Sequence, residues 1–240
     1  MLAYISKIFR RLGEVICPRH CLLCHRRLAI MERCLCSACS LSLPYTRYHA
    51  AIGNPLELLL HGRFPFERAS AYLYYIRGAR SRHIIFDLKY YNHPEVGVEL
   101  GRRMAADILE TGFFEGIDVL IPVPLAHRRQ QKRGYNQSEW LARGISGVTG
   151  LPVEARALKR TVDNPSQTTR TIAERAQNVE GIFALTLKGA ALLRGKHVLL
   201  VDDVVTTGAT VTACADALLQ AENVKISILS LSLSDRINRV

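Results

Sequence analysis

Apolar and polar residues alternate along the chain in two different periods after residue 68. Short apolar runs there have the length and composition of buried strands. The segments between them repeat apolar residues every three or four positions, as an amphipathic helix does. The strand-like runs are 69–76, 118–129, 198–202 and 224–233, and the helical patterns are 80–89, 94–110, 137–145, 172–179 and 209–220. Strands that alternate with helices predict an α/β fold with a parallel sheet flanked by helices.

The first 68 residues follow a different pattern. Residues 1–12 carry apolar side chains at helical spacing among basic ones, which predicts an amphipathic helix. Such a helix packs on the rest of the protein or touches a membrane surface. Turn residues after position 41 favour a linker. We therefore expect an N-terminal helix with a cysteine-rich unit over 1–44, a linker over 45–68 and the main domain over 69–240.

Composition and charge narrow the class of protein. With 48% hydrophobic and 22% charged residues, the chain is expected to fold rather than to be disordered. No apolar run approaches the roughly 18 residues of a membrane-spanning helix, and basic residues interrupt the start of the chain, so no secretory signal is expected. We expect a cytoplasmic protein that is not an integral membrane protein. The net charge of +11 is concentrated in residues 1–50 and 126–180, which favours partners that carry phosphate.

Six of the seven cysteines fall between residues 17 and 39, and four of them form the pattern C-x2-C-x11-C-x2-C. Two such pairs can place four thiolates around one cation, which predicts a structural zinc site with no open coordination position. A disulfide cluster and an iron–sulfur cluster are the alternatives. Cys17 and Cys34 lie outside the pattern and are spare thiols or alternative ligands. The predicted ligands are Cys21, Cys24, Cys36 and Cys39.

The run VLLVDDVVTTGAT at 198–210 is the most specific pattern in the chain. An apolar strand delivers Asp202 and Asp203 to its end, and small residues then lead into a helix. Backbone N–H groups at a helix start bind phosphate, and carboxylates accept hydrogen bonds from ribose hydroxyls. The run resembles the phosphoribosyl-pyrophosphate (PRPP) loop of type I phosphoribosyltransferases, although an ordinary strand followed by an acidic turn is the alternative. The predicted binding residues are Asp202, Asp203, Thr206, Thr207, Gly208, Ala209 and Thr210.

Three other segments are expected near this loop. The Pro122–Pro124 turn also follows a strand, and the carboxyl ends of parallel strands meet at one edge of a sheet. The basic segments 128–143 and 159–179 predict a lid over the ligand, with a solvated helix face and an ordinary loop as the alternative. Arg133 and Arg175 are the candidates to neutralise pyrophosphate during catalysis.

Together these motifs resemble the ComF family, which is associated with DNA uptake in naturally transformable bacteria. The resemblance covers the cysteine head ending in CLCSAC, DLKYY at 87–91, IPVPLAHRRQQKRGYNQSEWLA, NPSQTTRTIAERAQNVEGIF and the VLLVDDVVTTGAT loop. It implies a type I phosphoribosyltransferase-like fold behind a small N-terminal four-cysteine zinc-ribbon domain. It also implies a role in carrying incoming single-stranded DNA into the cytoplasm during transformation.

Three functions remain open at this point. The first is a DNA-uptake factor that binds PRPP and single-stranded DNA at the inner face of the membrane, beside a DNA-import helicase or membrane channel, with Tyr135 or Trp140 as a stacking platform. The second is a metabolic phosphoribosyltransferase that moves ribose 5-phosphate from PRPP to an acceptor, with Mg²⁺ on the pyrophosphate. No residue pattern identifies that acceptor. The third is a regulator that senses PRPP.

Overall fold

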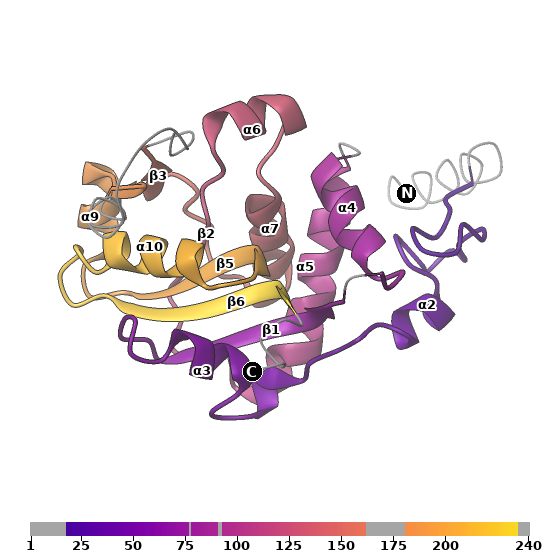
Figure 1. The fold of residues 1–240 in the computed structure, drawn as a ribbon, viewed down its shortest axis with the longest axis horizontal. Coiled ribbons are helices and arrows are strands. Elements are labelled where there is room, and N and C mark those ends of the chain that lie inside the picture. The colour runs from indigo at the N-terminus through magenta and orange to yellow at the C-terminus, as the bar shows by residue number, and fades with distance from the viewer. Residues whose placement is uncertain (1–17, 77, 91–92, 162–180, 235–240) are drawn as a thin grey trace, which may run out of the picture.

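The computed structural model describes residues 18–76, 78–90, 93–161 and 181–234 (Figure 1). Its centre is a sheet of four parallel strands in the order β1-β6-β5-β2. These strands are β1 (Arg68–Tyr75), β2 (Val119–Pro122), β5 (His197–Val205) and β6 (Lys225–Ser234). The expected α/β fold with a parallel sheet is confirmed.

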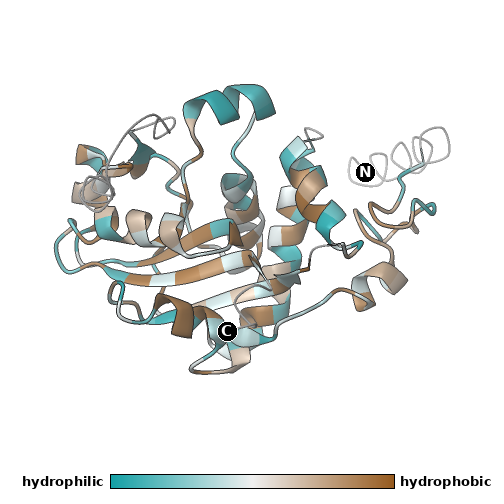
Figure 2. Cartoon of the chain, viewed as in Figure 1, coloured by the Kyte–Doolittle hydropathy of each residue, from teal (hydrophilic) through white to brown (hydrophobic). Residues whose placement is uncertain are grey.

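The sheet is buried on both faces, which explains why its strands are continuous apolar runs. On β5, Leu199 and Val201 belong to one buried cluster, and Val198 and Leu200 belong to a second cluster. Each of these side chains is fully buried. Figure 2 shows the same contrast, with hydrophobic residues along β5 and β6 and hydrophilic residues on α6.

Helices α4 (Arg82–Tyr90), α5 (Pro94–Ile108) and α7 (Gln137–Thr149) contribute to the first cluster. Helices α5 and α7 approach each other closely because glycines face the contact. A Cβ atom at Gly101 would lie 2.1 Å from the Leu141 carbonyl oxygen, and one at Gly144 would lie 2.1 Å from that of Val98. This close packing fixes the start of α7 relative to the sheet.

The second cluster includes residues of α3 (Pro55–Leu60), α9 (Leu187–Leu193) and α10 (Ala209–Leu218). An antiparallel pair of short strands, β3 (Leu158–Arg160) and β4 (Phe183–Leu185), packs against α10. Helix α6 (His127–Arg133) has no buried residue and projects from the body (Figure 1). Two 3-10 helices, η1 (Tyr48–Ala50) and η2 (Leu109–Thr111), complete the described elements.

The cysteine-rich unit contains the short helix α2 (Ser37–Leu41) and shares a core with the main body. Leu35 is fully buried in the same cluster as Leu100 and Met104 of α5. Arg103 of α5 also donates a hydrogen bond to Ser40 Oγ at 2.8 Å. The unit is therefore packed onto α5, through both apolar and polar contacts.

The structure differs from the sequence-based expectations in several segments. The expected linker contains α3, whose Leu56 and Leu60 are fully buried and whose start is capped by Asn54. The strand expected over 118–129 ends at Pro122, because Pro124, which follows it, has no N–H group to donate to a ladder. The helices expected over 1–12 and 172–179 lie outside the described residues. None of the helices in the described ranges is long and apolar enough to cross a membrane.

Candidate functional site

Asp202 and Asp203 lie near the carboxyl end of β5, as expected. Asp202 is buried, with 6% of its surface exposed, and Asp203 is half-buried. The Asp202 carboxylate accepts hydrogen bonds from the Asp203 backbone N–H at 2.8 Å and from Ser138 Oγ at 3.4 Å. The Lys89 ammonium lies 2.9 Å from Asp203 Oδ2. Groups from α4 and α7 thus hold the two carboxylates in different environments.

This difference changes the acidity of Asp202. Burial, followed by the negative charge of Asp203, raises the pKa of Asp202 to about 7. The backbone hydrogen bond from Asp203 and the charge of Lys89 oppose that rise. Asp202 therefore changes its protonation state near neutral pH, whereas Asp203 has a cation directly beside it.

The chain leaves β5 at Val205 and enters α10 at Ala209 through a turn that requires glycine. Gly208 has a φ of 79°, and a Cβ atom there would lie 3.0 Å from Arg63 Nη1. Arg63 also donates a hydrogen bond to the Thr207 carbonyl oxygen at 2.6 Å. The turn and the start of α10 surround a small hollow of about 20 Å³, lined by Asp202, Val204, Val205, Thr206, Gly208, Ala209, Thr210 and Val211. Helix-start N–H groups in such a hollow favour a phosphate.

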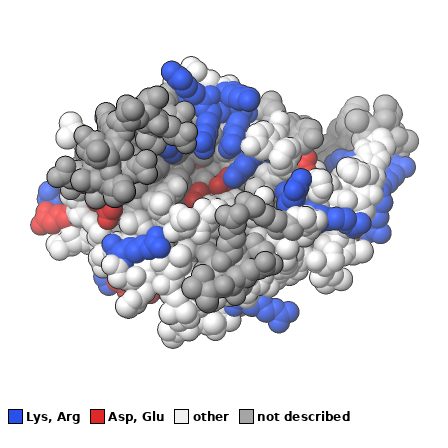
Figure 3. Space-filling model, in the orientation of Figure 1, with Lys and Arg blue, Asp and Glu red and all other residues white. Residues whose placement is uncertain are grey.

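A cavity of about 180 Å³ joins the two strand ends. Residues 123–125 follow β2, residues 202–204 end β5, and residues 136–138 begin α7. Thr210 and four cationic side chains complete the lining: Lys89, Arg129, Arg133 and Arg160. The predicted convergence of the two strand ends is confirmed. Figure 3 shows basic side chains gathered over α6, above a hollowed part of this face in which acidic side chains are visible.

Arg133, one of the two arginines predicted to meet pyrophosphate, lines this cavity at the end of α6. Its Nη1 donates a hydrogen bond to Gln137 Oε1 at 2.9 Å, and its guanidinium carbon lies 5.4 Å from the centre of the Tyr90 ring. Arg175 and most of the second lid segment lie outside the described residues. The first lid segment forms α6, a turn and α7.

The two aromatic residues predicted as stacking platforms differ in exposure. Tyr135 is buried, and its hydroxyl donates a hydrogen bond to the Leu88 carbonyl oxygen at 2.6 Å, so the expectation for Tyr135 is corrected. Trp140 is half-buried on α7, where the Arg143 guanidinium carbon lies 4.6 Å from the centre of its ring. The expectation for Trp140 stays a prediction.

Sequence reasoning also missed three side chains at the site: Lys89, Arg63 and Ser138. Lys89 belongs to the DLKYY motif, which indicated the family but did not indicate that Lys89 lies at the site. Ser138 lies in the predicted lid segment 128–143, but nothing in that segment singled it out, and Arg63 comes from a segment that was expected to be a linker.

The four predicted metal ligands do come together. The sulfur atoms of Cys21, Cys24, Cys36 and Cys39 all lie within 4.8 Å of one another, so this set of donors could hold a zinc ion. Burial would raise the pKa of the Cys21 thiol, but backbone N–H groups, first that of Cys36, lower it to about 6. All six described cysteines are free. Cys34 is buried outside the cluster, where burial raises its pKa to about 12, and Cys17 lies outside the described residues.

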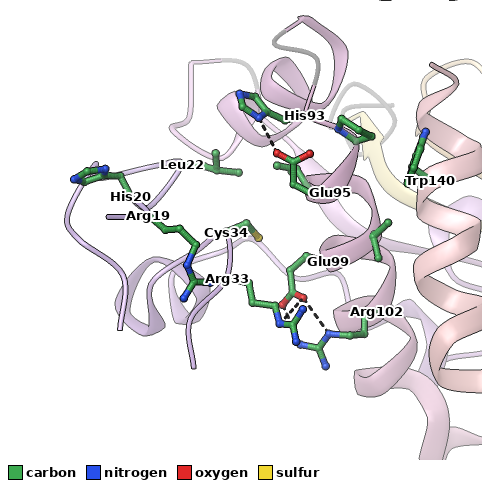
Figure 4. A pocket seen from close by; sticks show the side chains of 13 residues that line it. Arg19, His20, Leu22, Arg33, Cys34, His93, Glu95, Glu99, Arg102 and Trp140 are labelled. Carbon is green, nitrogen blue, oxygen red and sulfur yellow. Dashed lines mark hydrogen bonds and ion pairs between the residues drawn. The ribbon is translucent and has the colours of Figure 1, made fainter. Parts of the chain in front are cut away.

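A larger cavity of about 950 Å³ is lined by residues of the cysteine-rich unit and of helices α5 and α7, beside the contact between them (Figure 4). Glu99 lies on its wall and is held by hydrogen bonds from Arg102 and Arg103. Arg33 of the cysteine-rich unit reaches the same carboxylate at 3.6 Å. These charges pair with one another between the cysteine-rich unit and α5. The acidic pair of β5, Asp202 and Asp203, does not line this cavity.

Comparison with known proteins agrees with this geometry. Residues 89–239 match the family model described as phosphoribosyl transferase domain. The chain is 30% identical over 218 residues to DNA utilization protein YhgH of Shigella flexneri. The aligned region covers 85% of this chain and 92% of that protein. It is 26% identical over 222 residues to Competence protein F of Haemophilus influenzae, covering 88% and 96% respectively. Glutamine PRPP amidotransferase of B. subtilis superimposes with a TM-score of 0.40 and 23% identity, over 60% of this chain and 30% of that one.

Proposed function

This chain belongs to the ComF family of proteins with a phosphoribosyl transferase domain, and on that premise we propose that it binds PRPP with Mg²⁺ and single-stranded DNA. We place this activity at the cytoplasmic side of the membrane, in support of DNA uptake. The names of the relatives support the biological role, since they include DNA utilization and competence proteins. A DNA-import helicase or membrane channel is the proposed partner there.

The observation that supports the PRPP proposal is the acidic pair, Asp202 and Asp203, beside the turn between β5 and α10. The carboxylates of Asp202 and Asp203 would accept hydrogen bonds from the ribose hydroxyls, and the N–H groups of 206–210 would bind the 5-phosphate. Bound Mg²⁺ would supply positive charge that neutralises part of the pyrophosphate charge. Arg133 and Lys89 line the same cavity, and with Arg175 they would neutralise the remaining negative charge of the pyrophosphate.

Lys89 would change its partner when PRPP binds. Its ammonium lies 2.9 Å from Asp203 Oδ2. When ribose hydroxyls hydrogen-bond to that carboxylate, the ammonium can turn to the pyrophosphate within the same cavity. The ion pair thus keeps both charges compensated until substrate replaces it.

A metabolic phosphoribosyltransferase is the second candidate. The acidity of Asp202 favours it, because a carboxyl with a pKa of about 7 suits proton transfer to or from a reacting group at neutral pH. Release of pyrophosphate in the presence of an amine or base acceptor would support this activity. PRPP binding without release would support the third candidate, a PRPP-sensing regulator.

Calorimetric titration of the full chain with PRPP and Mg²⁺ tests the site. We expect saturable binding by the parent and at least ten-fold weaker binding by the double variant Asp202→Asn and Asp203→Asn. Asp216→Asn is the matched control, because Asp216 is exposed on α10 away from the cavity lining. Equal affinity of the double variant and the parent would show that the site is assigned to the wrong residues.

We also propose that zinc occupies the four-cysteine cluster and has a structural role. Four protein ligands leave no position for substrate. The unit shares its core with α5 rather than building one of its own, so the metal would order the unit for packing.

A further inference from the structure

A second cavity, of about 740 Å³, lies beside the one that contains the acidic pair. It is formed between the end of α4 and the exposed helix α6. Its lining is cationic and aromatic, with Lys89 and Tyr90 from α4 and Arg129, Gln131, Lys132 and Arg133 from α6. No acidic residue of the described part of the chain lines it, so the cavity suits an anion with an unsaturated ring.

Tyr90 lines this cavity, and Phe86, which does not line it, extends the aromatic surface through its contact with the Tyr90 ring. Phe86 and Tyr90 are one helical turn apart, with ring centres 4.5 Å apart and planes tilted by 40°. Phe86 is 46% exposed and Tyr90 is 56% exposed, although large apolar surfaces are usually buried. Neither ring belongs to the buried clusters beside the sheet. Stability of the core therefore does not explain the pair.

The cations of α6 are available for phosphate. Within the described part of the chain, Arg129 and Lys132 form no ion pair with a carboxylate. Arg133 lies against the Tyr90 ring, so a guanidinium and an aromatic face are presented together. A row of cations beside aromatic rings is the combination that binds single-stranded nucleic acid, because every base has a face that can stack.

Three cationic side chains line both cavities: Lys89, Arg129 and Arg133. A phosphodiester in the α4–α6 cavity and a pyrophosphate beside Asp203 would therefore draw on the same positive charges. Lys132 differs, because it lines the α4–α6 cavity and not the one with the acidic pair.

We propose that the α4–α6 cavity binds a nucleotide of single-stranded nucleic acid, with its base on Phe86 and Tyr90 and its phosphate on Arg129 and Lys132, and that this nucleotide and PRPP weaken each other's binding through the shared cations. The proposal rests on the proposed function, in that the same chain binds both ligands. Binding linkage makes the antagonism reciprocal, so each ligand lowers the affinity for the other by the same factor.

Fluorescence anisotropy of a labelled 20-nucleotide thymidine strand on the full chain tests the location. Stacking on aromatic side chains is sequence-tolerant and makes a large contribution for each base. We expect the double variant Phe86→Ala and Tyr90→Ala to bind the strand at least ten-fold more weakly than the parent. The conservative variant Phe86→Tyr and Tyr90→Phe keeps both rings and should retain the parent affinity. The double alanine variant should bind a duplex of the same length almost as tightly as the parent does, because the bases of a duplex are already stacked on one another.

The shared cations are tested by repeating the titration at saturating PRPP and Mg²⁺. We expect the strand to bind several-fold more weakly to the parent under these conditions. Lys132→Ala should weaken strand binding and reduce its salt dependence while leaving the calorimetric affinity for PRPP unchanged. Arg129→Ala should weaken the binding of both ligands.

The outcomes separate this proposal from the one on which it rests. If the parent binds PRPP but no single strand, the proposed function itself fails. If the parent binds the strand and the double alanine variant binds it equally well, the α4–α6 location is wrong. A strand affinity that is unchanged or raised by PRPP would overturn the antagonism.

Discussion

The Lys89 ammonium lies 2.9 Å from Asp203 Oδ2, so a residue of α4 is paired with the acidic pair at the end of β5. Both side chains are largely withdrawn from solvent, at 22% and 15% exposed. An ion pair at this depth is screened less by salt than one at the surface, and loss of one partner leaves the other charge uncompensated. The pair therefore links the position of α4 to the charge of the site.

We predict that Lys89→Met weakens PRPP binding by at least ten-fold. The variant removes a cation from the pyrophosphate side of the cavity and leaves Asp203 without its partner. A charge-assisted hydrogen bond contributes roughly 1.5–3 kcal/mol, and each 1.4 kcal/mol is about ten-fold in affinity. Calorimetric titration with PRPP and Mg²⁺ measures the change.

Lys188→Met is the control for that substitution, because Lys188 is exposed on α9 and lines neither cavity. Lys89→Arg should bind PRPP more tightly than Lys89→Met, since it keeps the charge. Equal affinities of Lys89→Met and the parent would exclude a role for this ammonium in binding.

The raised pKa of Asp202 predicts a pH dependence of stability. Its folded-state pKa is about 7, against 3.8 for an unperturbed group, so the folded state binds the proton more tightly than the unfolded chain does. This contribution to stability is complete below about pH 4 and is lost as pH rises through 7. The free energy of unfolding of the parent should therefore fall from pH 5 to pH 8 relative to that of Asp202→Asn.

Urea denaturation of both proteins at pH 5 and pH 8 measures that difference. Other titrating groups are common to the two proteins and largely cancel. Parallel changes in the parent and the variant would show that Asp202 ionises in the folded state much as it does in the unfolded chain.

Loss of one metal ligand should lower both the zinc content and the stability of the protein. We predict that Cys39→Ser holds less than one equivalent of zinc and unfolds at a lower temperature than the parent. The four cysteines belong to the unit that buries Leu35 against α5, so we expect this junction to loosen when the metal is lost. Metal analysis after dialysis, together with thermal unfolding, measures both effects.

Cys34→Ala provides the matched control for the metal site. Its thiol is buried in the same unit but lies outside the four-sulfur cluster. This variant should keep one equivalent of zinc even where it costs stability. Retention of a full equivalent by Cys39→Ser would contradict the ligand set.

The two halves of the site differ in how far the sequence could predict them. Asp202 through Thr210 are contiguous, so a strand, an acidic pair and a helix start could be recognised from local spacing alone. Lys89 and Ser138 reach the acidic pair only because α4 and α7 pack on one face of the sheet. That packing depends on close approach between helices, which no local pattern records.

The aromatic residues illustrate the same limit. Tyr135 lies in a basic segment and was predicted to stack on bases, but its hydroxyl is used within the fold by the Leu88 carbonyl oxygen. No sequence pattern marked Phe86 or Tyr90 as a stacking surface, yet α4 places Tyr90 in a cavity with α6 and Phe86 against the Tyr90 ring. The role of Arg175 and the domain boundaries at residues 44 and 68 remain predictions.

Two glycines on α7 offer a direct test of how helix packing sets the site. A Cβ atom at Gly144 would lie 2.1 Å from the Val98 carbonyl oxygen, so α5 and α7 would have to separate. We predict that Gly144→Ala destabilises the protein by about 1–3 kcal/mol, the usual cost of overpacking a tight contact. Because α7 carries Ser138, which donates to Asp202, PRPP affinity should fall as well.

Gly147 lies on the same helix, and a Cβ atom there would meet nothing within 4 Å. Alanine is favoured over glycine within a helix by about 1 kcal/mol, so Gly147→Ala should stabilise the protein slightly and leave PRPP binding unchanged. Denaturation curves and PRPP titrations of the two variants then separate helix propensity from helix spacing. If both substitutions changed stability in the same direction, the close contact between α5 and α7 would not be what positions Ser138 at the acidic pair.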